Sequence, residues 1–236
     1  MAIVPGTQKP RAIVCLSGGM DSCVCATIAA RDYEIYALHF SYGQRTEARE
    51  LLASSTIAEL LGAKEFLNLK IDLFRKIGGS ALTDRSIAVP DAPEEESAIG
   101  SEVPATYVPF RNAHFIAAAV SWAEVLDAEV ICIGAVEQDN SGYPDCRPPY
   151  YEAFNELIRL GTKTGSIRVV TPLIHMRKSE IVEVGVEVGA PFHVSWSCYS
   201  DENEACGICE SCVLRLRAFR QAGLADPIVY AAPQRN

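Results

Sequence analysis

The chain has 236 residues, 49% of them hydrophobic and 22% charged, which is typical of one globular domain and excludes a disordered, collagen-like or coiled-coil protein. Its 30 acidic and 21 basic residues give a formal net charge of −9, which argues against a nucleic-acid partner. A chain of this length buries roughly 70 to 75% of its unfolded surface, so it does not need disulfides to supply a missing core.

The first part of the chain alternates short apolar segments with helical patterns. Residues 12–16 (AIVCL) form a continuous apolar run that predicts a buried parallel strand, and a helix follows over residues 21–31. Residues 35–40 (IYALHF) predict a second buried strand, and after a polar loop a helix is expected over residues 46–61. Gly62 is a suitable residue to end that helix.

Two further strands are expected in the same part of the chain. Residues 64–72 contain the third strand and its exit loop. Residues 130–135 (VICIGA) form the last clear core strand, and a long helix over residues 111–126 precedes it. Strands that alternate with helices indicate an α/β fold, in which an open and mostly parallel sheet is covered by helices on both faces.

The segment 78–109 has a different character, with four prolines and an acidic triplet at residues 94–96. We expect a long, mobile surface loop that is either simply solvated or acts as a lid or a dimer contact. From residue 151 the pattern is mainly helical, with weak strand character at 167–170 and a helix over 177–188.

The segment 17–22 (SGGMDS) lies between the first strand and the first helix, where main-chain N–H groups and the positive end of a helix bind anions. Its glycines let the main chain approach an oxyanion, and its serines add hydroxyl donors. Asp21 can either cap the helix or hold a magnesium ion against phosphates. The segment has no lysine and lacks the G-x-G-x-x-G spacing, so it is neither of the common phosphate fingerprints. An ordinary glycine turn capped by Asp21 is the alternative.

This segment resembles the SGGxDS signature of the PP-loop ATP pyrophosphatases, also called adenine-nucleotide alpha hydrolases. The resemblance implies that the loop holds the β- and γ-phosphates of ATP, with Mg²⁺, and that adenylate passes to an acceptor oxygen. It also implies that the main chain of the second strand flanks the adenine. The implied ATP-binding residues are Leu16, Ser17, Gly18, Gly19, Met20, Asp21, Ser22, Leu38, His39 and Phe40.

Four cysteines near the carboxyl end follow the pattern C-x₇-C-x₂-C-x₂-C, namely Cys198, Cys206, Cys209 and Cys212. The C-x₂-C spacing lets consecutive thiolates converge on one ion, and Gly207 gives the turn the freedom that it needs. Four thiolates favour a closed tetrahedral zinc site with a structural role. An iron–sulfur cluster and four unligated core cysteines are the alternatives.

The cysteine pattern completes the expected organisation of the chain. A nucleotide-binding α/β core is expected over residues 1–150, and a helical region with the zinc site over residues 151–236, the two forming one compact unit. Arg215, Arg217 and Arg220 follow the cysteines and either approach the thiolates or phosphates or form an exposed helix face.

The remaining cysteines are less informative. Cys15, Cys23, Cys25 and Cys132 lie in apolar segments and are interpreted as small buried hydrophobes rather than as reagents. Cys146 lies in a polar loop, so it is the one of the five for which contact with a substrate is considered.

Three polar segments fall at carboxyl ends of strands or amino ends of helices, where an open α/β sheet places its ligands: 41–45 (SYGQR), 107–112 (YVPFRN) and 141–148 (SGYPDCRP). Together with Lys178, the four cysteines and the SGGMDS loop, they resemble the 7-cyano-7-deazaguanine synthase family over residues 12 to about 219. The resemblance implies a homodimeric, ATP-dependent ligase that forms C–N bonds in queuosine biosynthesis. It implies adenylation of a carboxylate, amide formation with ammonia, and a second activation that dehydrates the amide to a nitrile, with release of AMP or ADP-level products and of pyrophosphate or phosphate. Its implied partners are ATP, ammonia and 7-carboxy-7-deazaguanine.

The resemblance also implies residue roles. The catalytic residues would be Ser17, Asp21, Arg111 and Lys178, with Arg111 and Lys178 countering phosphate charge. The substrate-binding residues would be Tyr143, Asp145, Cys146 and Arg147, with Asp145 pairing with the guanine-like N–H edge. Phe110 and Pro149 depart from the family pattern, which bears on the details of the substrate pocket.

Two other functions are considered. One is another PP-loop adenylating enzyme, such as a tRNA thiolase or an amide synthetase, although the acidic charge disfavours tRNA. The other is a non-enzymatic nucleotide sensor with a structural zinc ion, which would bind ATP without turnover.

The expected location is cytoplasmic. Residues 1–11 show no basic region followed by an apolar core, so export is not expected. The most apolar longer stretch, around residues 115–120, falls short of the ~20 residues that span a bilayer. Nine cysteines, an odd number, indicate thiols or metal ligands in a reducing compartment.

Overall fold

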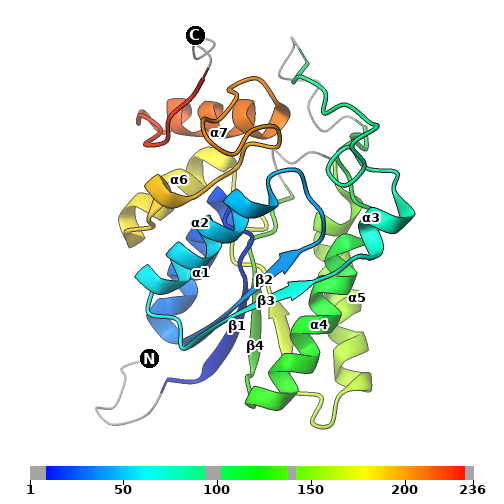
Figure 1. The fold of residues 1–236 in the computed structure, drawn as a ribbon. Coiled ribbons are helices and arrows are strands. Elements are labelled where there is room, and N and C mark those ends of the chain that lie inside the picture. Colours follow the sequence, from blue (N-terminus) through cyan, green and yellow to red (C-terminus); the bar gives the residue numbers. More distant parts are fainter. Residues whose placement is uncertain (1–8, 94–101, 138–141, 232–236) are drawn as a thin grey trace.

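A computed structural model describes residues 9–93, 102–137 and 142–231 (Figure 1). Its centre is one sheet of five parallel strands in the order β3-β2-β1-β4-β5. The strands are β1 (Arg11–Cys15), β2 (Glu34–Ser41), β3 (Glu65–Lys70), β4 (Val130–Ile133) and β5 (Arg168–Val170). The expected parallel α/β sheet is confirmed, and β5 forms where the strand pattern is weakest.

Helices cover both faces of this sheet, and Figure 1 shows α4 and α5 on one side with α1, α2 and α6 on the other. The helices are α1 (Met20–Asp32), α2 (Glu47–Leu60), α3 (Leu73–Ile77), α4 (Arg111–Leu126), α5 (Pro148–Gly161), α6 (Lys178–Val188) and α7 (Glu210–Gln221), with 3₁₀ turns η2 (Pro144–Cys146) and η3 (Phe192–Val194). None of the helices in these ranges is long and apolar enough to cross a membrane.

The alternation of side chains along β1 explains the two covered faces. Ala12 and Val14 belong to the core on the side of α1, whereas Ile13 belongs to the core on the side of α4. All three are fully buried, which is why the strand reads as a continuous apolar run rather than an alternating one.

The described part of the segment 78–109 packs against the rest of the protein, which differs from the expected solvated loop. Ser80, Ala81 and Leu82 are buried. Arg45 holds the segment, because its Nε–H donates to the carbonyl of Ala81 at 2.6 Å. Ala92 N–H donates to the carbonyl of Ile208 at 2.9 Å and so joins the segment to the cysteine-rich region. The acidic triplet 94–96 lies outside the described residues.

A buried ion pair between Arg215 and Asp226 joins α7 to the segment that follows it. Arg215 Nε lies 2.7 Å from Asp226 Oδ2 and Nη2 lies 2.9 Å from Oδ1, and the two side chains are 1% and 0% exposed. Tyr230 OH donates to the same carboxylate at 2.6 Å. The alternative of an exposed helix face is therefore wrong for Arg215. The domain boundary at residue 150 stays a prediction, and β5 beyond it joins the common sheet.

Candidate active site

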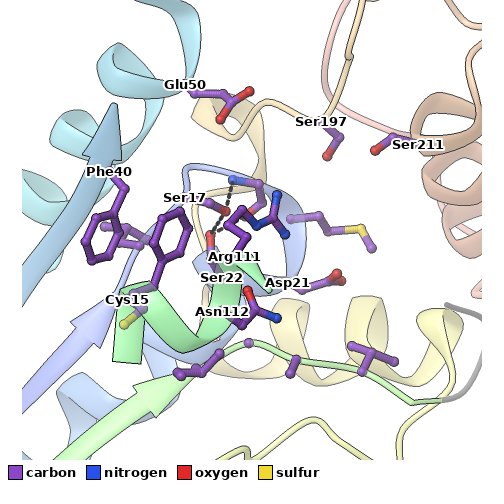
Figure 2. A pocket seen from close by; sticks show the side chains of 18 of the residues that line it. Cys15, Ser17, Asp21, Ser22, Phe40, Glu50, Arg111, Asn112, Ser197 and Ser211 are labelled. Atoms are coloured by element: carbon purple, nitrogen blue, oxygen red, sulfur yellow. Dashed lines mark hydrogen bonds between the residues drawn. The ribbon is translucent and has the colours of Figure 1, made fainter. Parts of the chain in front are cut away.

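A cavity of about 280 Å³ lies at the carboxyl ends of β1, β2 and β4 (Figure 2). The strand order reverses between β1 and β4, which is where open α/β sheets bind their ligands. The cavity brings together most of the residues singled out in the sequence: Leu16, Ser17, Gly19, Met20, Asp21, Ser22, Leu38, His39, Phe40, Arg111, Tyr143, Cys146 and Lys178.

The glycine loop between β1 and α1 is shaped by its own polar groups. Gly19 N–H donates to Ser17 Oγ at 3.2 Å, Ser17 Oγ–H donates to Ser22 Oγ at 2.9 Å, and Ser22 Oγ–H donates to the carbonyl of Gly19 at 3.0 Å. Trp196 N–H holds the loop from outside by donating to the carbonyl of Gly18 at 2.8 Å. The N-cap of α1 is Gly19, and no side chain caps the helix. The interpretation of Asp21 as the helix cap is therefore wrong, and the helix start can receive an anion.

We expect Gly18→Ala to unfold more easily and to bind ATP more weakly. Gly18 has a φ of +90°, and a Cβ there would lie 2.7 Å from the carbonyl oxygen of Glu50 and 3.0 Å from the Cβ of Ala53. We expect a loss of about 2 to 4 kcal/mol in the free energy of unfolding, measured by urea denaturation.

Gly62→Ala is the matched control, because Gly62 has a φ of +68° but nothing within 4 Å of the added Cβ. It should lose only about 1 kcal/mol and bind ATP normally. An equal loss of stability in the two variants would contradict the close packing of Gly18 on α2.

Asp21 and Lys178 form an ion pair inside the cavity, between the first turns of α1 and α6. Lys178 Nζ donates to Asp21 Oδ2, and the two side chains are 13% and 24% exposed. Asp21 Oδ1 is buried without a hydrogen-bond partner among the described residues. A free carboxylate oxygen beside an anion-binding loop is suited to a magnesium ion that accompanies a nucleotide.

Arg111 begins α4 and projects a second positive charge into the cavity. Its Nη1–H donates to Tyr42 OH at 3.1 Å, and its guanidinium carbon lies 5.8 Å from the ring centres of Tyr42 and Phe115. Its Nε is buried without a hydrogen-bond acceptor in the described ranges. A guanidinium that is always charged and keeps an unused donor is suited to an anionic ligand.

Of the four residues expected to bind the deazaguanine ring, two line the cavity and two do not. Tyr143 and Cys146 line the cavity. Asp145 is buried behind it, and its Oδ2 accepts the N–H of Asn112 at 3.1 Å at the start of α4, while its Oδ1 has no partner within the described chain. Arg147 is exposed at the N-cap of α5. The expected roles of all four remain predictions.

Cys146 is not an activated nucleophile. Burial, with a smaller contribution from Asp145, raises the pKa of its thiol to about 11, so the thiolate is scarce at neutral pH. We expect Cys146→Ser to keep the turnover rate within about threefold, because a thiol that stays protonated at neutral pH supplies no nucleophile. The measurement is the initial rate of turnover, and a loss of 100-fold or more would show that the sulfur takes part in the reaction.

The other core cysteines have equally unreactive thiols. Burial raises the pKa of Cys15, Cys23 and Cys132 to about 12, and the pKa of Cys25 is also well above its usual value. These shifts support their interpretation as small buried hydrophobes.

The four C-terminal cysteines form a candidate metal centre. Their sulfur atoms all lie within 4.8 Å of one another, and Cys206 Sγ lies 3.9 Å from Cys212 Sγ. A tetrahedron with zinc–sulfur bonds of about 2.3 Å has sulfur atoms about 3.8 Å apart, so the arrangement fits a zinc ion. Main-chain N–H groups of Ser200 and Cys206 point at Cys198 Sγ, at 3.4 and 3.3 Å, which favours the thiolate form.

The four clustered cysteines alternate along the chain with residues that line the cavity, which the sequence did not reveal. Ser197 and Tyr199 flank Cys198, Ser211 precedes Cys212, and Arg215 follows one turn later in α7. Figure 2 shows Ser197 and Ser211 facing the cavity across from the glycine loop. The candidate metal centre therefore supports one wall of the cavity. Glu50, on α2, is a further lining residue that sequence reasoning missed.

The sequence is similar to a known protein family and to named relatives. The family described as "Queuosine biosynthesis protein QueC" matches residues 11–223. The chain is 73% identical over 224 residues to a 7-cyano-7-deazaguanine synthase from Acidobacterium capsulatum, covering 95% of this chain and 98% of that protein. It is 63% identical over 224 residues to a protein of the same name from Koribacter versatilis, covering 94% and 93%.

Similar solved structures include an NH3-dependent NAD synthetase from Campylobacter jejuni in complex with the nitrate ion. The sequence identity is 16% and the TM-score 0.45, with 80% of this chain and 68% of that chain covered.

Proposed function

Because the chain belongs to the queuosine biosynthesis protein QueC family, we propose that it converts 7-carboxy-7-deazaguanine, ammonia and ATP into 7-cyano-7-deazaguanine. The observation that carries the proposal is the 73% identity, over 95% of the chain, to a relative named for the synthesis of that product. The cavity at the glycine loop supports it, because the loop and two cationic side chains are arranged to bind an anionic nucleotide.

The first step binds ATP and activates the carboxylate. The glycine loop holds the β- and γ-phosphates with main-chain N–H groups and the hydroxyls of Ser17 and Ser22, and the adenine lies against the end of β2. A carboxylate oxygen of the substrate attacks the α-phosphorus, and pyrophosphate leaves with the bonding electron pair. Arg111 and Lys178 stabilise the negative charge that develops in this transition state. The carboxylate is now an acyl-adenylate.

The next step forms the amide. Ammonia adds to the acyl carbon, the C–O bond to AMP breaks, and AMP leaves with the electron pair while a proton leaves the nitrogen. A carboxylate does not react this way without activation, because oxide is not a usable leaving group. Exclusion of water from the cavity protects the acyl-adenylate from hydrolysis.

A second activation then removes the remaining oxygen. The amide oxygen attacks the α-phosphorus of a second ATP, and pyrophosphate leaves again. Loss of AMP together with the two nitrogen-bound protons leaves the nitrile. The same phosphate loop and the same cations serve both activations, since each transfers adenylate to an oxygen on the same ring substituent.

Two metal ions fit the residues present. Cys198, Cys206, Cys209 and Cys212 would hold a structural zinc, which has no open position for a water and no part in the chemistry. Asp21 would hold the magnesium ion that accompanies ATP, because its Oδ1 is buried without a partner among the described residues. Magnesium would supply charge neutralisation on the phosphates.

The test supplies purified protein with ATP, Mg²⁺, ammonium and 7-carboxy-7-deazaguanine. Mass spectrometry should detect the nitrile, together with two AMP for each nitrile formed. A folded protein with metal bound that forms no nitrile would overturn the proposal. Adenylation of a different acid, or sulfur transfer to tRNA, would then identify another PP-loop adenylating enzyme. The cytoplasmic location and the homodimer remain predictions.

A further inference from the structure

Glu50 places a second carboxylate in the cavity, apart from the Asp21–Lys178 pair. It lies at the end of the first turn of α2 and lines the cavity together with the glycine loop and Arg111. Figure 2 shows its side chain above Ser17 and Arg111, on the side of the cavity opposite Asn112. In the described ranges no Lys or Arg nitrogen is within ion-pair distance of its carboxylate, and the steps derived above do not use it.

The hydrogen bonds of Glu50 fix its position and leave room for a proton. Gln44 Nε2–H donates to Glu50 Oε2 at 3.2 Å and also to the carbonyl of Phe40 at 3.1 Å, so both amide hydrogens of Gln44 are used. Thr46 Oγ lies 2.8 Å from Glu50 Oε1 and 3.1 Å from the carbonyl of Cys198.

A hydroxyl group has one hydrogen, so Thr46 cannot donate fully to both of these oxygens at once. When Glu50 is ionised, Thr46 donates to its carboxylate. When Glu50 is protonated, it can donate to Thr46 Oγ, and Thr46 then donates to the carbonyl of Cys198. The site therefore accommodates both protonation states of Glu50 by turning one hydroxyl.

The electrostatic environment agrees with such an exchange. Burial raises the pKa of Glu50 to about 7, whereas hydrogen bonds from Thr46 and Gln44 and the charge of Arg111 act to lower it. Glu47 on the same helix acts to raise it. Tyr42, which faces both Glu50 and Arg111, stays protonated, because burial raises the pKa of its phenol to about 12. A carboxylate in this range is suited to proton transfer at neutral pH.

We propose that Glu50 binds the ammonium ion and accepts the proton that must leave before the nitrogen can attack the activated carboxylate. The proposal rests on the proposed function, since it assigns the base of the amide-forming step. Arg111 holds the phosphate of the acyl-adenylate and Glu50 holds the nucleophile, and both line the same cavity of about 280 Å³.

The step balances in atoms and charge. Ammonium transfers one proton to the Glu50 carboxylate and becomes ammonia, whose lone pair forms the C–N bond. The C–O bond to AMP breaks, and AMP takes that electron pair. A second proton leaves the new amide nitrogen for the AMP phosphate or water. Glu50 then releases its proton to solvent for the next turnover.

The test is Glu50→Gln in the full-length protein with metal bound, assayed for two steps separately. Exchange of labelled pyrophosphate into ATP in the presence of 7-carboxy-7-deazaguanine reports adenylation and should stay within about threefold of the unmodified protein. Amide formation from ammonium at neutral pH should fall about 100-fold or more. Hydroxylamine is largely unprotonated at neutral pH, so hydroxamate formation should stay near the unmodified rate.

Glu47→Gln is the control, because Glu47 lies one turn earlier on α2 and its carboxylate accepts the N–H of Gly43 outside the cavity. It should stay within about threefold of the unmodified protein in all three assays, since Glu47 makes the smallest of the contributions to the pKa of Glu50. If Glu50→Gln loses ammonium and hydroxylamine reactions equally, or loses neither, the assignment of Glu50 as base is wrong. An unmodified protein that shows no exchange with the carboxylate would instead overturn the proposed function.

Thr46→Val keeps the proposal testable if Glu50→Gln does not fold. Removing the hydroxyl takes away a hydrogen bond that lowers the pKa of Glu50, so its pKa rises. The acidic limb of the ammonium-dependent rate should move to higher pH, while the pH profile with hydroxylamine stays in place. Equal movement of both profiles, or movement of neither, would overturn the proposal.

Discussion

Asp21→Asn is expected to abolish ATP-dependent turnover while leaving the fold and the metal content intact. Asparagine has nearly the same shape as aspartate but no charge. The substitution removes the carboxylate that pairs with Lys178 and whose Oδ1 is left without a hydrogen bond in the described part of the chain. We expect the rate of pyrophosphate release to fall about 1,000-fold or more, because both magnesium binding and the position of Lys178 depend on that charge.

The effect on stability should be much smaller. The ion pair is partly exposed, so its loss should cost about 1 to 2 kcal/mol in the free energy of unfolding. Asp32→Asn is the matched control, because Asp32 is an exposed residue at the other end of α1. A nearly normal rate for Asp21→Asn, measured beside this control, would show that the phosphate chemistry takes place elsewhere.

Cys209→Ser should lose the metal and much of the stability together. Cys209 is buried at 1% exposure, and its sulfur belongs to the cluster of four whose atoms lie within 4.8 Å of one another. A serine oxygen is a poor zinc ligand and would leave three thiolates close together. We expect a loss of about 5 kcal/mol and a fall in melting temperature of roughly 10 to 20 °C.

Elemental analysis and thermal denaturation of the same preparation would check this result. ATP binding should weaken as well, because Ser197, Ser211 and Arg215 line the cavity from the segment that carries the four clustered cysteines. Cys146→Ser provides the control, since it also removes one thiol but lies outside the cluster. Unchanged metal content and melting temperature in Cys209→Ser would refute the metal assignment.

The regular elements could be predicted because their patterns are local. The apolar runs at β1, β2 and β4 and the glycine at the end of α2 predict elements within a few residues of those observed. The five-residue helix α3 and the packed segment around Ala81 were missed. The segment around Ala81 is held by a hydrogen bond from Arg45, which is 36 residues away in the sequence, so no local pattern could reveal it.

In the candidate site, too, residues in short sequence motifs could be predicted, whereas residues that only the fold brings together could not. The glycine loop and the cysteine spacing are short patterns whose chemistry can be interpreted directly. In the structure the loop lines the cavity and the four cysteines form one cluster. Glu50 carries no motif and becomes notable only when the fold brings it to the cavity, and for Arg215 only the structure decides between the alternatives that the sequence left open. Conversely, Asp145 belongs to a motif, but only the structure reveals that its carboxylate caps α4.

The buried pair of Arg215 and Asp226 gives the last residues of the chain an importance that their sequence does not suggest. A chain that lacked Asp226 would keep every helix and strand of the fold, yet it would leave a guanidinium of 1% exposure without its counter-charge. Loss of this one carboxylate should therefore destabilise the folded state by about 3 to 5 kcal/mol, although Asp226 lies far from any recognisable motif.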